Sequence, residues 1–472
     1  MEHLAGECAG ATLKPFLRMA IHQSDPYRLE SDEILEAPAR LGQKLRFLGP
    51  GFILSASVVG SGELIATTSL GAKAGFATLW VILVSCLVKI VLQLEFGRQS
   101  ITRGQTAMHM MNQMPGPRFG KQKVSWAAWS WLVLWLFKPL QLGGIIGGVA
   151  IILHIAVPAL SVAIWTVITA FVVITVMLYG FYEVVEKVSL VFMAMFTLFT
   201  LLALFMVQNT QFAISWPQIA EGLSFRLPKG TVGFAFAVFG LTGVGGDEIM
   251  SYNYWCLEKG YARFAGIRDD SESWKRRARG WIRVMYLDAF LSMVVYTIVT
   301  ASFFLLGASI LYRQGEIPEG YQMIETLSRI YTESVGPTAK NIFLMGSFVV
   351  LFSTLFAALA IRTRVFSDLF GVVGWIDFGN LASRLRTIRL LAILFPVLWT
   401  IAFLLIKLPV LMVTIGGIAT FVMLFIVVFA GLWFRYGTKE KILPPGRLYN
   451  LFLLISCLAI FLVGVYGIFR LF

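Results

Sequence analysis

Two short stretches of this chain place glycines and carboxylates inside long apolar runs. They read VGSGELI over residues 59–65 and VGGDEIM over residues 244–250. A helical glycine costs about 1 kcal/mol relative to alanine, and an acid at the membrane midplane costs about 2.5–3.5 kcal/mol. Carboxylates and freed carbonyls attract cations, whereas the N-terminal ends of half-helices attract anions. The pattern therefore predicts a substrate site built from Gly60, Ser61, Gly62, Glu63, Gly245, Gly246, Asp247 and Glu248.

The composition is that of a polytopic membrane protein, whose partner is the lipid bilayer. Hydrophobic residues make up 58% of the 472 residues and charged residues only 14%, against about 25% charged in soluble domains. Mean hydropathy is +0.78. The net charge of +13 arises from basic residues between apolar runs, which indicates topology determinants and not a nucleic-acid partner. The first 46 residues are polar and show no secretory signal peptide.

Eleven apolar segments have roughly the length of about 20 residues that one membrane crossing needs. Basic loops alternate with less basic ones if all eleven cross, which predicts a cell-membrane protein with a cytoplasmic N-terminus and an external C-terminus. Pro409 separates the ninth segment from the tenth. The segments are 48–70, 79–94, 131–155, 160–179, 188–207, 231–256, 284–311, 342–361, 390–406, 410–434 and 451–469.

The glycine–carboxylate stretches fall in the first and sixth segments, so equivalent positions are five crossings apart. An odd number of crossings per repeat inverts the second copy, as in secondary transporters whose broken helices meet near the midplane. We therefore expect a tail over 1–46 and a transmembrane domain over 47–472. That domain contains inverted repeats at about 47–208 and 231–434 and an extra helix at about 449–471.

From Gly49 onward the chain resembles the NRAMP family of proton-coupled divalent-metal transporters. The resemblance is carried by Gly-Pro-Gly-Phe at 49–52, by Gly-Ala-Lys-Ala-Gly-Phe at 71–76 and by the second segment, and it covers most of residues 47–434. It implies an all-α LeuT-like fold of two five-helix repeats and one extra helix, eleven transmembrane helices in all.

The resemblance implies a small inorganic cation as substrate, and protons as coupling ions. The family's Asp-Pro-Gly-Asn sequence aligns with residues 60–63, and its methionine ligand aligns with Gly245 or Gly246. Because oxygen ligands replace the thioether, we expect Glu63, Asp247 and Glu248 to bind a divalent cation of the Mg²⁺ or Mn²⁺ type. Residues 141–148 carry none of the acids associated with proton passage in the family.

Lys89, Lys138 and Asp288 are candidate gating or coupling residues inside apolar segments. A lysine there is costly unless it is paired or reaches the interface, and Glu95 is one candidate partner for Lys89. A fixed cation would also repel a metal ion. The alternative to metal transport is therefore a LeuT-like transporter of a small organic or anionic solute, with Lys138 or Lys89 as counter-ion. The residues form no catalytic constellation, and we expect neither an enzyme nor a cofactor.

Overall fold

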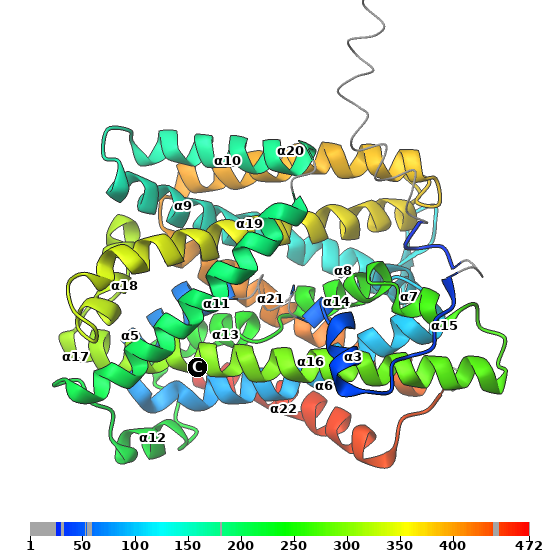
Figure 1. The fold of residues 1–472 in the computed structure, drawn as a ribbon, viewed down its shortest axis with the longest axis horizontal. Coiled ribbons are helices and arrows are strands. Elements are labelled where there is room, and N and C mark those ends of the chain that lie inside the picture. Colours follow the sequence, from blue (N-terminus) through cyan, green and yellow to red (C-terminus); the bar gives the residue numbers. More distant parts are fainter. Residues whose placement is uncertain are drawn as a thin grey trace, which may run out of the picture.

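The computed structural model describes residues 25–29, 33–51, 53, 59–179, 182–437 and 443–471. Long apolar helices lie side by side in one bundle (Figure 1). Within the described part, ten helical runs are long and apolar enough to cross a membrane. The architecture confirms the expected all-α polytopic class.

The helices of the first predicted repeat begin with a π-helical segment, η3, which continues directly into α5. A sharp turn at η4, where Gly75 has φ +58°, then leads into α6. The elements are η3 Val59–Thr67, α5 Thr68–Ala74, η4 Gly75–Thr78, α6 Leu79–Arg103, α8 Trp126–Trp135, α9 Lys138–Ala156, α10 Val162–Tyr179 and α11 Tyr182–Met206.

The second predicted repeat starts with a helix in two pieces, α13 and α14, and a final helix, α22, follows it. Its long helices are α13 Val232–Leu241, α14 Gly246–Glu258, α16 Glu272–Leu306, α19 Ala339–Val373, α20 Leu381–Ile406, α21 Pro409–Leu432 and α22 Arg447–Leu471. The π-helical segments η7 Gly307–Leu311 and η9 Trp433–Gly437 extend α16 and α21.

Short elements connect these helices or lie over their ends. The strands β1 Arg118–Phe119 and β2 Val124–Ser125 pair antiparallel. The helices are α3 Leu41–Lys44, η2 Leu45–Phe47, α7 Ala107–Asn112, η5 Val207–Asn209, α12 Trp216–Gly222, η6 Lys229–Thr231, α15 Tyr261–Ala265, α17 Tyr312–Gln314, η8 Gly320–Gln322 and α18 Met323–Thr332.

The eleven expected crossings correspond to ten apolar runs because the first two are joined. The run Gly62–Arg103 contains the second half of predicted segment 48–70 and all of segment 79–94. Residues 52 and 54–58 of the first segment lie outside the described residues. The boundary between the ninth and tenth segments is confirmed: Lys407 adopts a left-handed conformation with φ +58°, and Pro409 begins α21.

Two groups of helices enclose the broken helix. Helices α9, α10, α19 and α20 pack together on one side of the bundle, and α6, α16 and α22 lie on the other (Figure 1). The pieces α13 and α14 and helix α21 lie between them. Glycines let α9 approach its neighbours closely: a Cβ at Gly144 would lie 2.7 Å from the Pro409 carbonyl oxygen. Small residues serve this purpose at membrane helix interfaces.

Candidate functional site

The sixth predicted crossing is broken, as the sequence indicated. Helix α13 ends at Leu241, and α14 begins at Gly246. Between them Gly243 has φ +66°, a left-handed conformation that glycine adopts without steric cost. A Cβ at Gly246 would lie 2.9 Å from the Met423 Cβ and 3.0 Å from the Leu424 nitrogen. Glycine is therefore required here both for the turn and for the close approach of α21.

Asp247 lies in the first turn of α14 and is held by two buried cations. Its Oδ2 lies 2.9 Å from Lys138 Nζ on α9 and 3.3 Å from Arg362 Nη2 on α19. Lys138 Nζ also donates to Thr420 Oγ1 at 2.7 Å. Each of the three charged side chains is less than 10% exposed as a residue. One carboxylate thus links α14 to α9 and α19, two helices of one group.

In the part of the chain that the structure describes, no salt bridge is formed by Glu248, the next residue. Among the described residues, no hydrogen bond is made by the buried Oε2 of Glu248, the Oδ1 of Asp247 or the Nη1 of Arg362. All three residues line a cavity of about 20 Å³, which is room for a water molecule or an ion of similar size. Its other walls are largely apolar and include Trp131, Trp135 and Trp255. Residues that carry unpartnered acceptors and a donor therefore line one small space.

Glu63 lies in η3 on the other side of the break. It is fully buried, and its Oε1 accepts a hydrogen bond from Thr300 Oγ1 at 2.8 Å. Its Oε2 has no hydrogen-bond partner among the described residues. A Cβ at Gly62 would lie 3.2 Å from the Leu241 carbonyl oxygen, so this segment packs directly against the end of α13.

From Val59 onward, the described residues of the first crossing are not unwound in the way that the sixth crossing is; residues 52 and 54–58 lie outside the described part. Residues 59–67 keep a helical but π-type winding, in which Thr67 Oγ1 donates to the Gly62 carbonyl at 2.8 Å. Wider π-turns occur frequently at functional sites. Gly60 and Ser61 belong to this segment, and their side-chain environment lies outside the described part of the structure.

Lys89 is buried on α6, and its ammonium donates to the carbonyl oxygens of Phe239 and Thr242 at 2.7 Å and 2.5 Å. It does not use the expected partner: Glu95 accepts instead from Arg98 Nη2 at 2.8 Å. The lysine therefore lies on the C-terminal end of α13.

Asp288 anchors the start of the first crossing. Its Oδ1 accepts from the Gly49 amide at 2.8 Å and its Oδ2 from the Gly51 amide at 2.6 Å. The Tyr252 hydroxyl also donates to Oδ2, at 3.1 Å. The carboxylate thus joins α16 and α14 to the amides that begin the first crossing.

The sequence comparison decides the family. Residues 51–470 match the family described as Natural resistance-associated macrophage protein-like, Nramp. The chain belongs to the Nramp family. It is 26% identical over 283 residues to the divalent metal cation transporter MntH of Staphylococcus saprophyticus, and 25% identical over 288 residues to MntH 1 of Pseudomonas aeruginosa. These alignments cover 58% and 60% of this chain and 58% and 61% of the two relatives.

Solved structures share the fold at low identity. A manganese transporter of Eremococcus coleocola superposes with TM-score 0.59 at 13% identity, with 93% of this chain and 90% of that one covered. MhsT in complex with L-phenylalanine gives TM-score 0.53 at 15% identity, with coverage of 93% and 100%. The Nramp chain is thus a multi-pass membrane protein that shares the LeuT fold of these structures.

The expected site residues of this Nramp chain fall into two groups. Asp247 and Glu248 share the cavity, whereas Glu63 lies against Thr300. In the part of the chain that the structure describes, no three or more His, Cys, Asp and Glu side chains form a group that could hold a metal ion. The metal ligation by Glu63, Asp247 and Glu248 stays a prediction.

Arg362 and the three cavity tryptophans were missed by sequence reasoning. By sequence alone Arg362 is expected in a loop, because the apolar segment 342–361 ends just before it. Helix α19 instead continues to Val373, which places Arg362 within the bundle. An arginine one position beyond an apolar segment, followed by Val365 and Phe366 at helical spacing, was the available signal.

Proposed function

We propose that this Nramp chain is a secondary transporter that works by alternating access, with its substrate bound beside Asp247 and Glu248 at the break between α13 and α14. One observation carries this proposal: Asp247, Glu248 and Arg362 line one buried cavity, and each has a buried polar atom, Oδ1, Oε2 and Nη1 respectively, without a hydrogen-bond partner among the described residues. Leaving such groups unsatisfied costs about 1–3 kcal/mol each. A bound solute would satisfy them.

Alternating access separates the group of the first, second, sixth and seventh crossings from that of the third, fourth, eighth and ninth, by analogy with the fold. In the present structure these two groups are joined by contacts between α14, which belongs to the sixth crossing, and α19, which forms the eighth. The Tyr254 hydroxyl donates to Asp368 Oδ2 at 2.6 Å, and Arg364 Nε donates to Glu258 Oε1 at 2.6 Å. These contacts support a state in which the path is closed at this end of α14.

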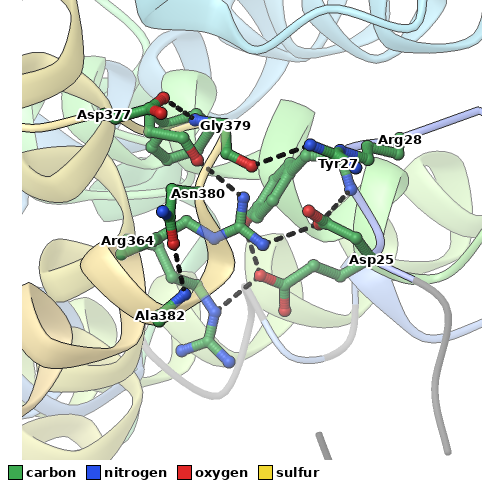
Figure 2. A network of polar contacts seen from close by, with 11 residues as sticks. Asp25, Tyr27, Arg28, Arg364, Asp377, Gly379, Asn380 and Ala382 are labelled. Atoms are coloured by element: carbon green, nitrogen blue, oxygen red, sulfur yellow. Dashed lines mark hydrogen bonds and ion pairs between the residues drawn. The ribbon is translucent and has the colours of Figure 1, made fainter. Parts of the chain in front are cut away.

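The N-terminal segment strengthens the same closure (Figure 2). The Tyr27 hydroxyl donates to Glu258 Oε1 at 2.6 Å, and Asp25 Oδ1 lies 2.7 Å from Arg384 Nη2 on α20. Arg28 Nη2 donates to the Gly379 carbonyl at 3.0 Å. We name residues 25–29 the strap. It connects α14 to the segment before α20, so opening at this end requires the strap to release. With the proposed cytoplasmic N-terminus, this is the inner gate.

The charges of these groups match a small organic zwitterion, for which the closed cavity of about 20 Å³ must widen during the transport cycle. Lys138 and Arg362 already neutralise Asp247, so a bare divalent ion would meet fixed positive charge. A zwitterion instead offers an ammonium group to Glu248 and a carboxylate to the free Nη1 of Arg362. The cavity tryptophans provide apolar surface and cation–π faces for the rest of such a solute.

Divalent-cation transport, of the Mg²⁺ or Mn²⁺ type, is the second candidate. It is favoured by the relatives named as metal transporters. The unpartnered carboxylate oxygens of Glu63, Asp247 and Glu248 also support it, because hard cations prefer oxygen ligands. In either case we propose a cell-membrane location, the two inverted repeats predicted above and coupling to an ion, with protons as the candidate.

Uptake into liposomes that contain the purified chain separates the two candidates. Radiolabelled amino and carboxylic acids are tested beside Mg²⁺, Mn²⁺ and Ca²⁺, with Glu248→Gln as the site variant and empty liposomes as background. The zwitterion proposal expects accumulation of an amino acid that Glu248→Gln abolishes. Accumulation of a divalent ion alone would establish the second candidate and reject the first.

A further inference from the structure

The C-terminal end of α13 is occupied by a cation that belongs to the chain. Lys89 Nζ donates to the Phe239 and Thr242 carbonyls, and it lies 5.3 Å from the centre of the Phe239 ring. Ser85, one turn earlier on α6, donates to the same two carbonyls at 3.0 Å and 3.2 Å. Neither side chain has solvent exposure. A lysine that reached the interface would have an exposed ammonium, so this lysine is not of that kind.

The carbonyls in the last turn of a helix have no partner within the helix and carry partial negative charge. At α13 the chain turns away at Gly243, so the helix does not continue and cannot satisfy them. In transporters with broken helices, such carbonyls coordinate an exchangeable cation. Here the lysine ammonium takes that position.

Acidic side chains lie near the ammonium on both sides of the break. Glu63 on η3 and Glu248 on α14 lie near enough to Lys89 to interact with it electrostatically. A free Na⁺ or K⁺ at the same carbonyls would be repelled by the ammonium already there. The position is therefore filled by the chain itself, without an added ion.

We infer that Lys89 is a built-in cation that holds the break between α13 and α14 in place of an exchangeable Na⁺ or K⁺. The break consequently needs neither ion to hold its conformation. The inference concerns the structure of the break and goes beyond the proposed substrate; only its transport readout rests on the proposed function.

The first experiment measures hydrogen exchange of the peptide that spans Thr242–Gly246 in the purified chain. Lys89→Ala removes the ammonium and leaves space for propylammonium, which replaces the lost atoms. Because hydrogen bonds to charged groups are strong, we expect amide exchange at the break to be about tenfold faster or more in Lys89→Ala. Propylammonium should restore most of the protection, and 1-propanol, its neutral counterpart, should not.

Two variants serve as controls. Ser85→Ala removes a neutral donor to the same carbonyls and should accelerate exchange less, without response to propylammonium. Lys89→Met keeps the apolar stem and should behave like Lys89→Ala without added amine. Unchanged exchange in Lys89→Ala, or equal rescue by 1-propanol, would overturn the inference, since the side chain would then only fill space.

A second measurement needs no variant. The melting temperature of the wild-type chain should be the same in Na⁺, K⁺ and choline buffers of equal ionic strength, because an ion that bound the folded state would raise it. The uptake rate of whatever solute the chain transports should differ less than about twofold among these buffers. A melting temperature that rises specifically with Na⁺ or K⁺ would overturn the inference even if Lys89→Ala failed to fold. Because stability and exchange are measured without transport, failure of the proposed function would leave this test intact.

Discussion

Replacing Asp247 tests whether the charges around the break act as one unit. Asp247→Asn leaves Lys138 and Arg362 buried without their shared carboxylate. Removing one partner of a buried ion pair costs about 3–5 kcal/mol, so we expect a loss of that size in the free energy of unfolding. Lys138→Met should cost less, because Asp247 keeps Arg362 as its partner.

The double variant Asp247→Asn/Lys138→Met restores the net charge of the wild-type cluster. It should therefore be more stable than the sum of the single variants indicates, by about 1–3 kcal/mol, the usual coupling range of contacting residues. The wild-type chain, the two single variants and the double variant form a double-mutant cycle. Equilibrium unfolding in mixed detergent and SDS measures the free energy of unfolding of all four.

The matched control is the pair formed by Lys73 and Glu319. Their charged atoms are 3.6 Å apart, but the Glu319 side chain is 68% exposed, and exposed pairs contribute about 0–1 kcal/mol. The corresponding cycle with Lys73→Met and Glu319→Gln should show little coupling. If the Asp247 cycle were additive to within about 0.5 kcal/mol, the buried cluster would not be the electrostatic unit described above.

Three further outcomes follow from the geometry. Glu248→Gln should lower uptake at least tenfold and change the free energy of unfolding by less than about 1 kcal/mol, since Oε2 has no partner to lose; equal losses in both measurements would indicate a structural role. Tyr27→Phe removes the hydroxyl bound to Glu258 and should speed labelling of a cysteine placed at Ser251 by a thiol reagent added on the strap side; an unchanged rate would exclude the strap from the gate. Gly246→Ala should destabilise the chain by about 1–3 kcal/mol through overpacking, whereas Gly233→Ala in α13, with no atom within 4 Å of the added Cβ, should not; thermal melting of both checks this.

The break in the sixth crossing could be predicted from the sequence, because the free-energy cost of a continuous helix there depends on neighbouring residues alone. Two glycines followed by two acids in an apolar run disfavour a continuous helix whatever surrounds them, and α13 and α14 separate at that place. The same argument predicted a break in the first crossing, where the described residues keep π-helical winding. The glycine cost alone does not determine which non-α geometry a segment adopts.

The partners of the buried charges could not be predicted in the same way. The sequence shows that a lysine at 89 or 138 needs compensation, but it does not show which distant group provides it. Lys138 meets an acid of α14, and Lys89 meets backbone carbonyls of α13, which no pattern of side-chain types reveals. Both depend on how the two helix groups enclose the break.

The most direct test of the account is a distance measurement between the two helix groups. Spin labels at Arg279 on α16 and Arg386 on α20, both exposed, report their separation in liposomes by pulsed electron paramagnetic resonance. The account predicts two distance populations, with the longer one increasing in Tyr27→Phe and changing on addition of the transported solute. A single distance, unaffected by that variant and by every solute that enters the liposomes, would contradict alternating access about the break.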